Sequence, residues 1–182
     1  MKLKFRLLTI AVVALLLMQS KNIFAQGGVF DDTKSIKQMT TKDKLKIAND
    51  LFEAGSFYNA IEYYKEYLAD DSGNPEATFK LAEAYRFSRD YRKAEDWYKR
   101  AYNADKNINI LALYYQALMM KYNCKHLEAK PIFLDFVKKY KDDEGKEIRK
   151  RARMEAAGCE DALVLMQNPL KITVNHLGSS VN

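Results

Sequence analysis

The sequence has few of the residues that interrupt helices and few of those that carry catalysis. Its 182 residues include only 3 Pro and 7 Gly, while Ala, Leu, Tyr, Lys and Glu are abundant, which favours helices. The 2 His lie far apart, and no Gly-rich phosphate loop, His-Glu-x-x-His or Gly-x-Ser-x-Gly motif occurs. Carboxylates are numerous, but a helical sequence this charged always contains Asp and Glu pairs. The sequence therefore predicts a protein that is not an enzyme, with no metal and no cofactor.

The basic character of the chain comes mostly from its first 25 residues. The whole chain has 30 Lys and Arg against 24 Asp and Glu, a net charge of +6. Residues 1–25 hold four of the basic residues and no acid, so the remainder carries 26 basic against 24 acidic residues, or +2. Only residues 146–153 are locally basic, and we interpret them first as the solvated face of a helix and only distantly as an anion-binding patch. A nucleic-acid partner is not expected.

The N-terminal segment is typical of a secretory signal peptide. Basic residues within 2–6 precede an apolar run, 7–18, broken only by Thr9, and a polar stretch then leads to Ala25. We expect cleavage after Ala25, so that Gln26 begins a mature chain of about 157 residues, which suits one domain. A retained membrane anchor is the alternative, but spanning a bilayer takes about 20 apolar residues. The sequence thus predicts export to the periplasm, with no Cys near the cleavage region to carry a lipid.

The rest of the chain repeats itself with a period of 34 or 35 residues. Small residues recur where two helices of one unit would approach closely, and aromatic residues recur where they would fill the space towards the next unit. The aligned residues are Ala48 with Ala82, Leu51 with Tyr85, Phe57 with Tyr91, Ala60 with Ala94 and Tyr64 with Tyr98 at a shift of 34, and Ala82 with Ala117, Ala94 with Ala129, Tyr98 with Phe133 and Ala101 with Phe136 at a shift of 35. Most aromatic rings are therefore predicted to pack in the core and not to stack on nucleic acid.

With this period and these residue types, residues 42–166 resemble the tetratricopeptide repeat family. The resemblance implies an all-α superhelix of three helix pairs with a C-terminal capping helix. The expected helices are 42–53 and 58–70 in a first unit (42–74), 75–87 and 91–103 in a second (75–108), 109–123 and 127–140 in a third (109–143), and 147–166 as the cap. Residues 26–41 are predicted to be a flexible segment. Residues 167–182 are predicted to be an extended tail and a candidate start of a further domain.

The sequence around and after the cap resembles a narrower group. Residues 157–162, 168–169 and 174–182, together with the signal ending at 23–26, are similar to the N-terminal portion of Bacteroidota OmpA-family envelope proteins. In these relatives the repeats precede a β-propeller-like segment and a peptidoglycan-binding OmpA-like domain, and some of them serve type IX secretion and gliding. The resemblance implies a place in the cell envelope. Peptidoglycan binding would belong to the later domains and to no residue of this chain.

The first helix of each unit is expected to line an inner groove. The expected lining mixes aromatic and aliphatic anchors with charged residues, as a peptide- or helix-binding groove requires. The predicted groove residues are Leu45, Asn49, Phe52, Phe79, Glu83, Arg86, Tyr114, Leu118 and Lys121. Some family members clamp a C-terminal carboxylate, but here only Asn49 fits that mode, because Phe79 and Leu111 stand where basic residues would help. Either a separate protein or another segment of the same protein could fill the groove.

Cys124 and Cys159 are candidates for a disulfide, because an exported protein meets an oxidising compartment. They are 35 residues apart, which places them at equivalent positions in successive units. Neighbouring helix axes lie about 8–10 Å apart, and helix tilt could bring the Cα atoms within the roughly 7 Å that a disulfide needs. The alternative is two free buried thiols. His126 is close to Cys124, but it takes the usual aromatic position of the repeat, so packing is the expected role.

Two functions remain open. The first is an exported protein-interaction module that acts as a scaffold or adaptor in the periplasm or at the outer membrane, with outer-membrane or secretion-machinery components as partners. The second is a structural spacer that precedes a peptidoglycan-binding OmpA-like domain and has no specific ligand of its own.

Overall fold

The computed structural model describes residues 36–107, 109–142 and 145–167. The predicted signal peptide with its cleavage site at Ala25 and Gln26, and the predicted tail from residue 168, lie outside these ranges. Most of the predicted flexible segment, 26–41, lies outside them too. Its described part contains a short 3-10 helix, η1 (Ile36–Gln38), and Thr41, the first residue of the next helix.

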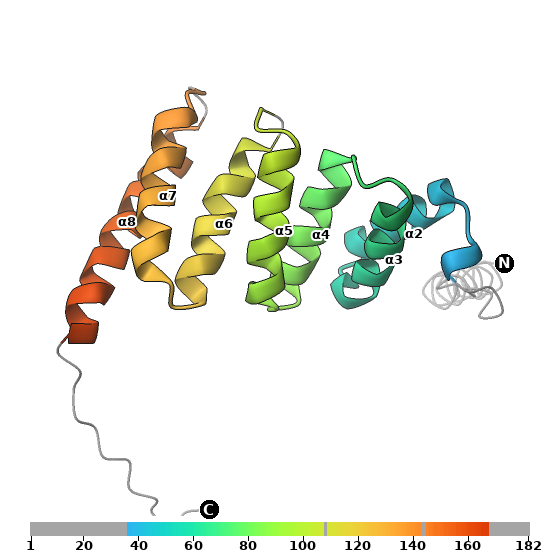
Figure 1. Cartoon of the computed structure of the whole chain (residues 1–182), viewed down its shortest axis with the longest axis horizontal. Helices are drawn as coiled ribbons and strands as arrows, with labels where there is room; N and C mark the ends of the chain where they lie inside the picture. The colour runs from blue at the N-terminus through green and yellow to red at the C-terminus, as the bar shows by residue number, and fades with distance from the viewer. Residues whose placement is uncertain (1–35, 108, 143–144, 168–182) are drawn as a thin grey trace, which may run out of the picture. The chain divides into compact units, whose positions relative to one another are not determined.

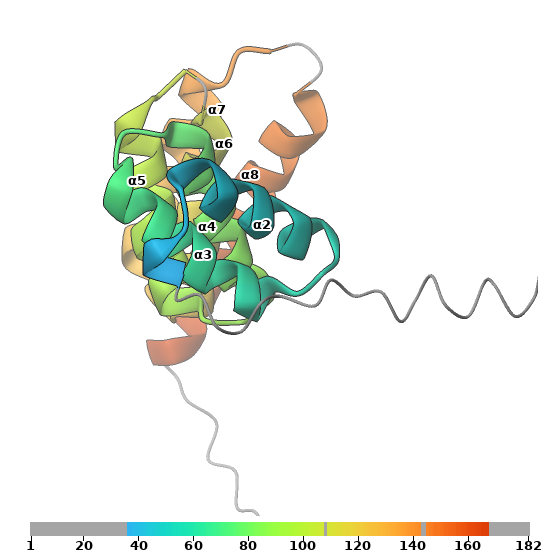
Figure 2. The same cartoon turned by 90° about the vertical axis from the view of Figure 1, so that its right-hand side faces the viewer.

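The compact unit that begins at Met39 is a row of α-helices, each packed against the next in the chain (Figure 1). The helices are α2 (Thr41–Glu53), α3 (Phe57–Asp70), α4 (Pro75–Phe87), α5 (Tyr91–Ala104), α6 (Ile110–Tyr122), α7 (His126–Lys139) and α8 (Lys146–Gln167). Figure 2 looks along this row, with α2 and α3 nearest the viewer. The described residues contain no strand. The all-α prediction of three helix pairs and a final helix is confirmed, and each predicted helix end lies within one residue of the observed one.

The repeated small and aromatic residues form the core of the row. The paired alanines of each unit, Ala48 with Ala60, Ala82 with Ala94 and Ala117 with Ala129, are fully buried, as are Tyr64, Tyr98 and Phe133. An alanine at each crossing lets the two helices approach, and the ring one turn later fills the space between units at the packing density of protein interiors. The prediction that these rings serve the core is confirmed.

The same type of turn joins the two helices of each of the three pairs. Gly55, Arg89 and Cys124 occupy equivalent repeat positions, and all three have positive φ, at 74°, 62° and 60°. In each turn the backbone N–H one residue further on donates to a carbonyl five residues back, as Ser56 does to Leu51 at 2.8 Å. This is the hydrogen bond of a Schellman cap. Glycine adopts the left-handed conformation without cost, whereas Arg89 and Cys124 pay for it in backbone strain.

Helix α8 closes the C-terminal end of the row. Its buried stripe is thin, with Ala152, Ala156 and Cys159 inside, and its outer face includes the exposed Met154 and Leu165. The predicted disulfide is absent, because Cys124 and Cys159 are both free. Cys124 lies exposed in the turn after α6, whereas α8 continues without a turn through the equivalent position, which leaves Cys159 buried mid-helix. Burial raises the pKa of the Cys159 thiol and so disfavours its reactive thiolate.

Candidate functional site

The first helices of units two and three share a hollowed face with the start of α8. A cavity of about 570 Å³ opens there, within the size range of ligand pockets. We call this cavity with the adjoining faces of α2 and α4 the groove. The cavity is lined by Arg86 of α4, by Leu111, Tyr114, Tyr115 and Leu118 of α6, by Tyr140, Asp142 and Gly145 before α8, and by Glu147, Ile148 and Arg151 of α8.

The apolar wall of the cavity is built on stacked aromatic rings. Tyr115 is half-buried, and its ring stacks on that of the buried Tyr98 with centroids 5.4 Å apart. Phe79 of α4 meets both rings edge-on, 5.6 Å from Tyr98 and 6.2 Å from Tyr115. Leu118, one turn further along α6, is half-buried as well. Rings held by their neighbours present apolar area at little entropic cost, which suits an anchor site for a partner side chain.

A hydrogen-bonded network holds Arg86 at the cavity wall. Its guanidinium donates to both carboxylate oxygens of Glu83, at 2.5 and 3.1 Å, and also to the hydroxyl of Tyr98 at 3.0 Å. The Tyr98 hydroxyl in turn donates to Glu83. Burial, the largest single cause, lowers the pKa of Arg86, but the hydrogen bonds and charge interactions with Glu83 and Tyr98 together outweigh it and leave the pKa above its usual value. The same guanidinium lies over the rings of Phe87, at 4.1 Å, and Tyr115, at 5.0 Å, so Arg86 is a fixed cation on this wall.

The groove continues onto α2 through a second group of rings. Phe52 is half-buried and meets Phe57 edge-on at 5.2 Å and Phe87 at 6.1 Å. Lys80 of α4 places its ammonium 4.5 Å from the Phe52 ring and pairs with Glu53 at 3.4 Å. Phe87 is 44% exposed. This cluster is therefore accessible from solvent and carries both an apolar surface and a cation.

The remaining predicted residues on α2 line a small recess. Leu45 is half-buried and Asn49 exposed, and both line a cavity of about 60 Å³ with Lys80. The Asn49 side-chain oxygen accepts a hydrogen bond from the Tyr64 hydroxyl at 2.7 Å. Part of the hydrogen-bonding capacity of Asn49 is thus used inside its own unit, where it satisfies a buried phenol.

Two of the predicted groove residues have mainly structural roles. Tyr114 is only 6% exposed, and its ring packs against Phe133 at 5.7 Å and Phe136 at 5.5 Å. Lys121 pairs with Glu155 at 2.5 Å and so ties α6 to α8. Tyr114 does line the cavity, but at 6% exposure it offers a partner little surface. Its neighbour Tyr115 presents the accessible ring.

Sequence reasoning also missed the contribution of α8. Ile148 and Arg151 line the cavity from the last helix, for which the sequence predicts only a capping role. The signal that could have found them is the repeat register itself, because α8 follows the third unit where the first helix of a fourth unit would stand. Leu111 also lines the cavity, although the sequence indicates only that it does not suit a carboxylate clamp.

The architecture defines a helical-repeat protein with a lined inner groove, and the solved structures that are similar to it in fold include the following three. The second tetratricopeptide domain of human RPAP3, in complex with an HSP70 peptide, is 22% identical, with 68% of this chain and 98% of that chain covered and a TM-score of 0.55. The TPR2B domain of yeast Sti1 in complex with an Hsp70 peptide is 16% identical, covers 68% and 98%, and has a TM-score of 0.56. The type III secretion translocator chaperone SycD of Yersinia enterocolitica is 12% identical, covers 72% and 91%, and has a TM-score of 0.57.

Residues 51–119 match the family model described as tetratricopeptide repeat. This part of the chain is therefore similar to tetratricopeptide repeats, in agreement with the fold of the solved structures named above. No curated protein matches the sequence. The described residues hold no group of three or more His, Cys, Asp or Glu side chains that could bind a metal ion. Among the same residues, the helices are too short or too polar to span a bilayer.

Proposed function

We propose that this chain is a protein-interaction module whose groove holds a segment of a partner protein. The observation that carries the proposal is the cavity between α4, α6 and α8, where half-buried rings and leucines stand beside the fixed guanidinium of Arg86. Apolar anchors beside a few charges are what a bound peptide or helix needs. The peptides in the two complexes named above support this use of the fold. The two arginines and two carboxylates that line the cavity give it no single sign of charge.

Leu118→Glu should abolish partner capture while the protein stays folded. The substitution places a charge on the apolar wall, which a buried partner side chain would have to desolvate. Leu134→Glu is the matched control, because Leu134 is a 39% exposed residue of α7 that does not line the cavity.

The tagged mature proteins would be used to capture partners from envelope extracts, with mass spectrometry and circular dichroism as readouts. If Leu118→Glu captures the same proteins as the parent, the groove is not the binding site. If neither protein captures anything specific, the spacer function is favoured.

We further propose that the module is exported and works as a scaffold or adaptor in the bacterial cell envelope. The support is in the sequence: the basic, apolar and small-residue order of 1–25, and the resemblance of the residues around 157–182 to OmpA-family envelope proteins. A role beside outer-membrane or type IX secretion components belongs to this proposal. The alternative is a spacer that precedes a peptidoglycan-binding OmpA-like domain.

The export proposal predicts a new N-terminus at Gln26. Expression of the full sequence in a Gram-negative host, followed by fractionation and intact-mass measurement, should give a periplasmic protein that lacks residues 1–25. Replacing Val12 and Val13 with arginine splits the apolar run 7–18 into two pieces of five residues each and should leave an unprocessed protein in the cytoplasm, because the signal needs about 7–15 apolar residues. Processing of that variant equal to the parent, or a parent that retains Met1, would overturn the proposal.

A further inference from the structure

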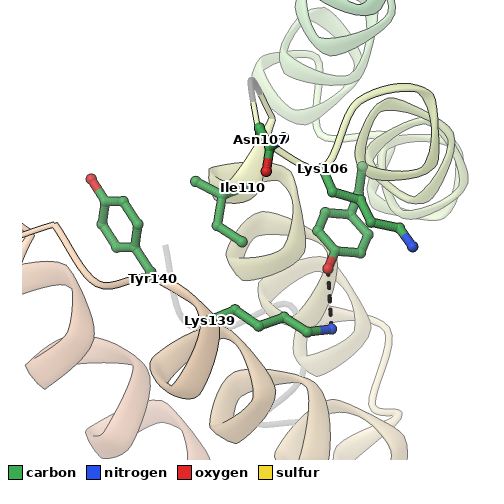
Figure 3. A pocket seen from close by; sticks show the side chains of 6 residues that line it. Lys106, Asn107, Ile110, Lys139 and Tyr140 are labelled. Atoms are coloured by element: carbon green, nitrogen blue, oxygen red, sulfur yellow. Dashed lines mark hydrogen bonds between the residues drawn. The ribbon is translucent and has the colours of Figure 1, made fainter.

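A second cavity, of about 510 Å³, opens where the α5–α6 turn meets the end of α7. It is lined by Tyr102, Lys106, Asn107, Ile110, Lys139 and Tyr140, and shares only Tyr140 with the groove cavity. In the view of Figure 3, Ile110 lies between Tyr140 on the left and Lys106 on the right, and the Lys139 side chain runs below them. The lining thus combines two ammonium groups with two aromatic rings and one aliphatic side chain.

Hydrogen-bond donors outnumber acceptors among these side chains. Lys139 donates to Asp135 at 2.6 Å and to the Tyr102 hydroxyl at 3.1 Å, which leaves one of its three N–H groups unused. Because the Tyr102 oxygen accepts from Lys139, its own O–H remains free to donate. Lys106 forms no ion pair with a described residue, and none of the six lining residues is a carboxylate. The side-chain hydrogen-bond acceptors among the six residues are the Asn107 amide oxygen and the hydroxyl oxygens of Tyr102 and Tyr140.

Helix-end electrostatics account for only part of this arrangement. Lysines in the last turn of a helix offset its exposed carbonyl groups, and Lys138 and Lys139 stand in the last turn of α7. Lys106 follows the end of α5, whose last turn holds no basic residue. The hydrogen bond with Asp135 is the larger cause of the raised pKa of Lys139, followed by that with Tyr102, so the ammonium is charged at neutral pH. Two cations therefore line this cavity, and none of its described lining residues is a carboxylate.

We propose that this cavity binds a small organic anion, a carboxylate or phosphate attached to an apolar body. Lys106, Lys139 and the Tyr102 hydroxyl would contact the anionic group. The Tyr140 ring and Ile110 would contact the apolar part. Apart from Tyr140, its described lining residues differ from those of the groove cavity, so anion binding does not depend on the protein-binding function proposed above.

Binding would be measured by NMR on the ¹⁵N-labelled mature protein, with benzoate and phenyl phosphate as the anionic probes and benzamide as the neutral isostere of benzoate. The expected result is saturable shifts of the Lys106, Asn107 and Ile110 amides with at least one anion and none with benzamide. Lys106→Gln and Lys139→Gln should each weaken binding about tenfold, the factor for losing one charge-assisted hydrogen bond. Lys138→Gln is the matched control, because Lys138 lies next to Lys139 but outside the cavity, and it should change the affinity less than about twofold.

Three results would overturn the proposal. Benzamide could bind as tightly as benzoate, which would make the cavity a simple apolar recess. Lys138→Gln could weaken binding as much as the two cavity variants do, which would mean that the anions follow general surface charge. Neither anion could produce saturable shifts at these three amides, which would mean that the cavity is not a binding site. A parent spectrum overlaid on each variant's spectrum identifies a misfolded variant, and the benzoate and benzamide comparison on the parent needs no variant.

Discussion

Phe133→Ala is expected to lower the free energy of unfolding by about 3–5 kcal/mol, the usual cost of removing a fully buried ring. Phe133 is completely inaccessible to solvent and meets Tyr114 edge-on with centroids 5.7 Å apart. The lost ring would leave a cavity between α6 and α7 that rigid neighbours such as Phe136 cannot fill. Because repeats contact only their neighbours, unit three and α8 should open before units one and two. Urea denaturation followed by circular dichroism measures the loss, and hydrogen exchange shows where it falls.

Leu134→Ala is the control for that prediction. It removes apolar atoms from the adjacent residue of the same helix, but Leu134 is 39% exposed, so the loss should stay below about 1 kcal/mol. Equal losses for the two substitutions would contradict the assignment of Phe133 to the buried core. They would also undermine the repeat register that predicts it.

The fold was predictable because each helix pair repeats the same local rules. The two buried alanines paired in each unit, such as Ala82 and Ala94, allow a close crossing of its two helices. Turn positions recur with the same period, and the first of them can be recognised in the sequence because it is a glycine, Gly55. The second and third turns could not be recognised in this way, since Arg89 and Cys124 adopt positive φ without the residue type that signals it. There, the helix packing on both sides determines the backbone conformation.

The groove was harder to predict. The position of an aromatic residue on a helix face does not determine how much of its ring is buried by the neighbouring helices. Tyr114 and Tyr115 are neighbours of the same residue type, and a rotation of α6 by a fraction of a turn exchanges their roles. Both rings line the cavity, but Phe133 and Phe136 pack against Tyr114 and bury it, whereas Tyr115 is only half-buried. Contacts from a second helix therefore determine which residue is accessible. The interpretation of α8 as a simple cap failed for the same reason, because a periodic pattern alone does not say whether a cap also faces the groove.

Alkaline pH is expected to destabilise the protein steeply, because two of its tyrosines are fully buried. Burial raises the pKa of Tyr64 and of Tyr98 far above the usual value, and nearby carboxylates, Glu53 for Tyr64 and Glu83 for Tyr98, raise it further. In the unfolded chain a tyrosine loses its proton near pH 10. Above that pH the unfolded state binds fewer protons than the folded state. The stabilisation that these protonated phenols provide is therefore complete below about pH 10 and declines above it, by about 1.4 kcal/mol per pH unit for each tyrosine.

Urea denaturation between pH 8 and pH 11.5, on the parent and on phenylalanine variants, measures this slope. Several lysines titrate in the same range, but they are common to all the proteins, so the comparison isolates each phenol. Tyr64→Phe and Tyr98→Phe should each lower the free energy of unfolding by about 1 kcal/mol at pH 8, because a hydrogen bond is lost. Above pH 10, each should also make the decline of this free energy with pH less steep, by about 1.4 kcal/mol per pH unit. Tyr58→Phe, at a residue 78% exposed, should leave the slope unchanged. A parent whose stability stays level to pH 11, or variants that keep its full slope, would show that Tyr64 and Tyr98 ionise as freely in the folded protein as in the unfolded chain.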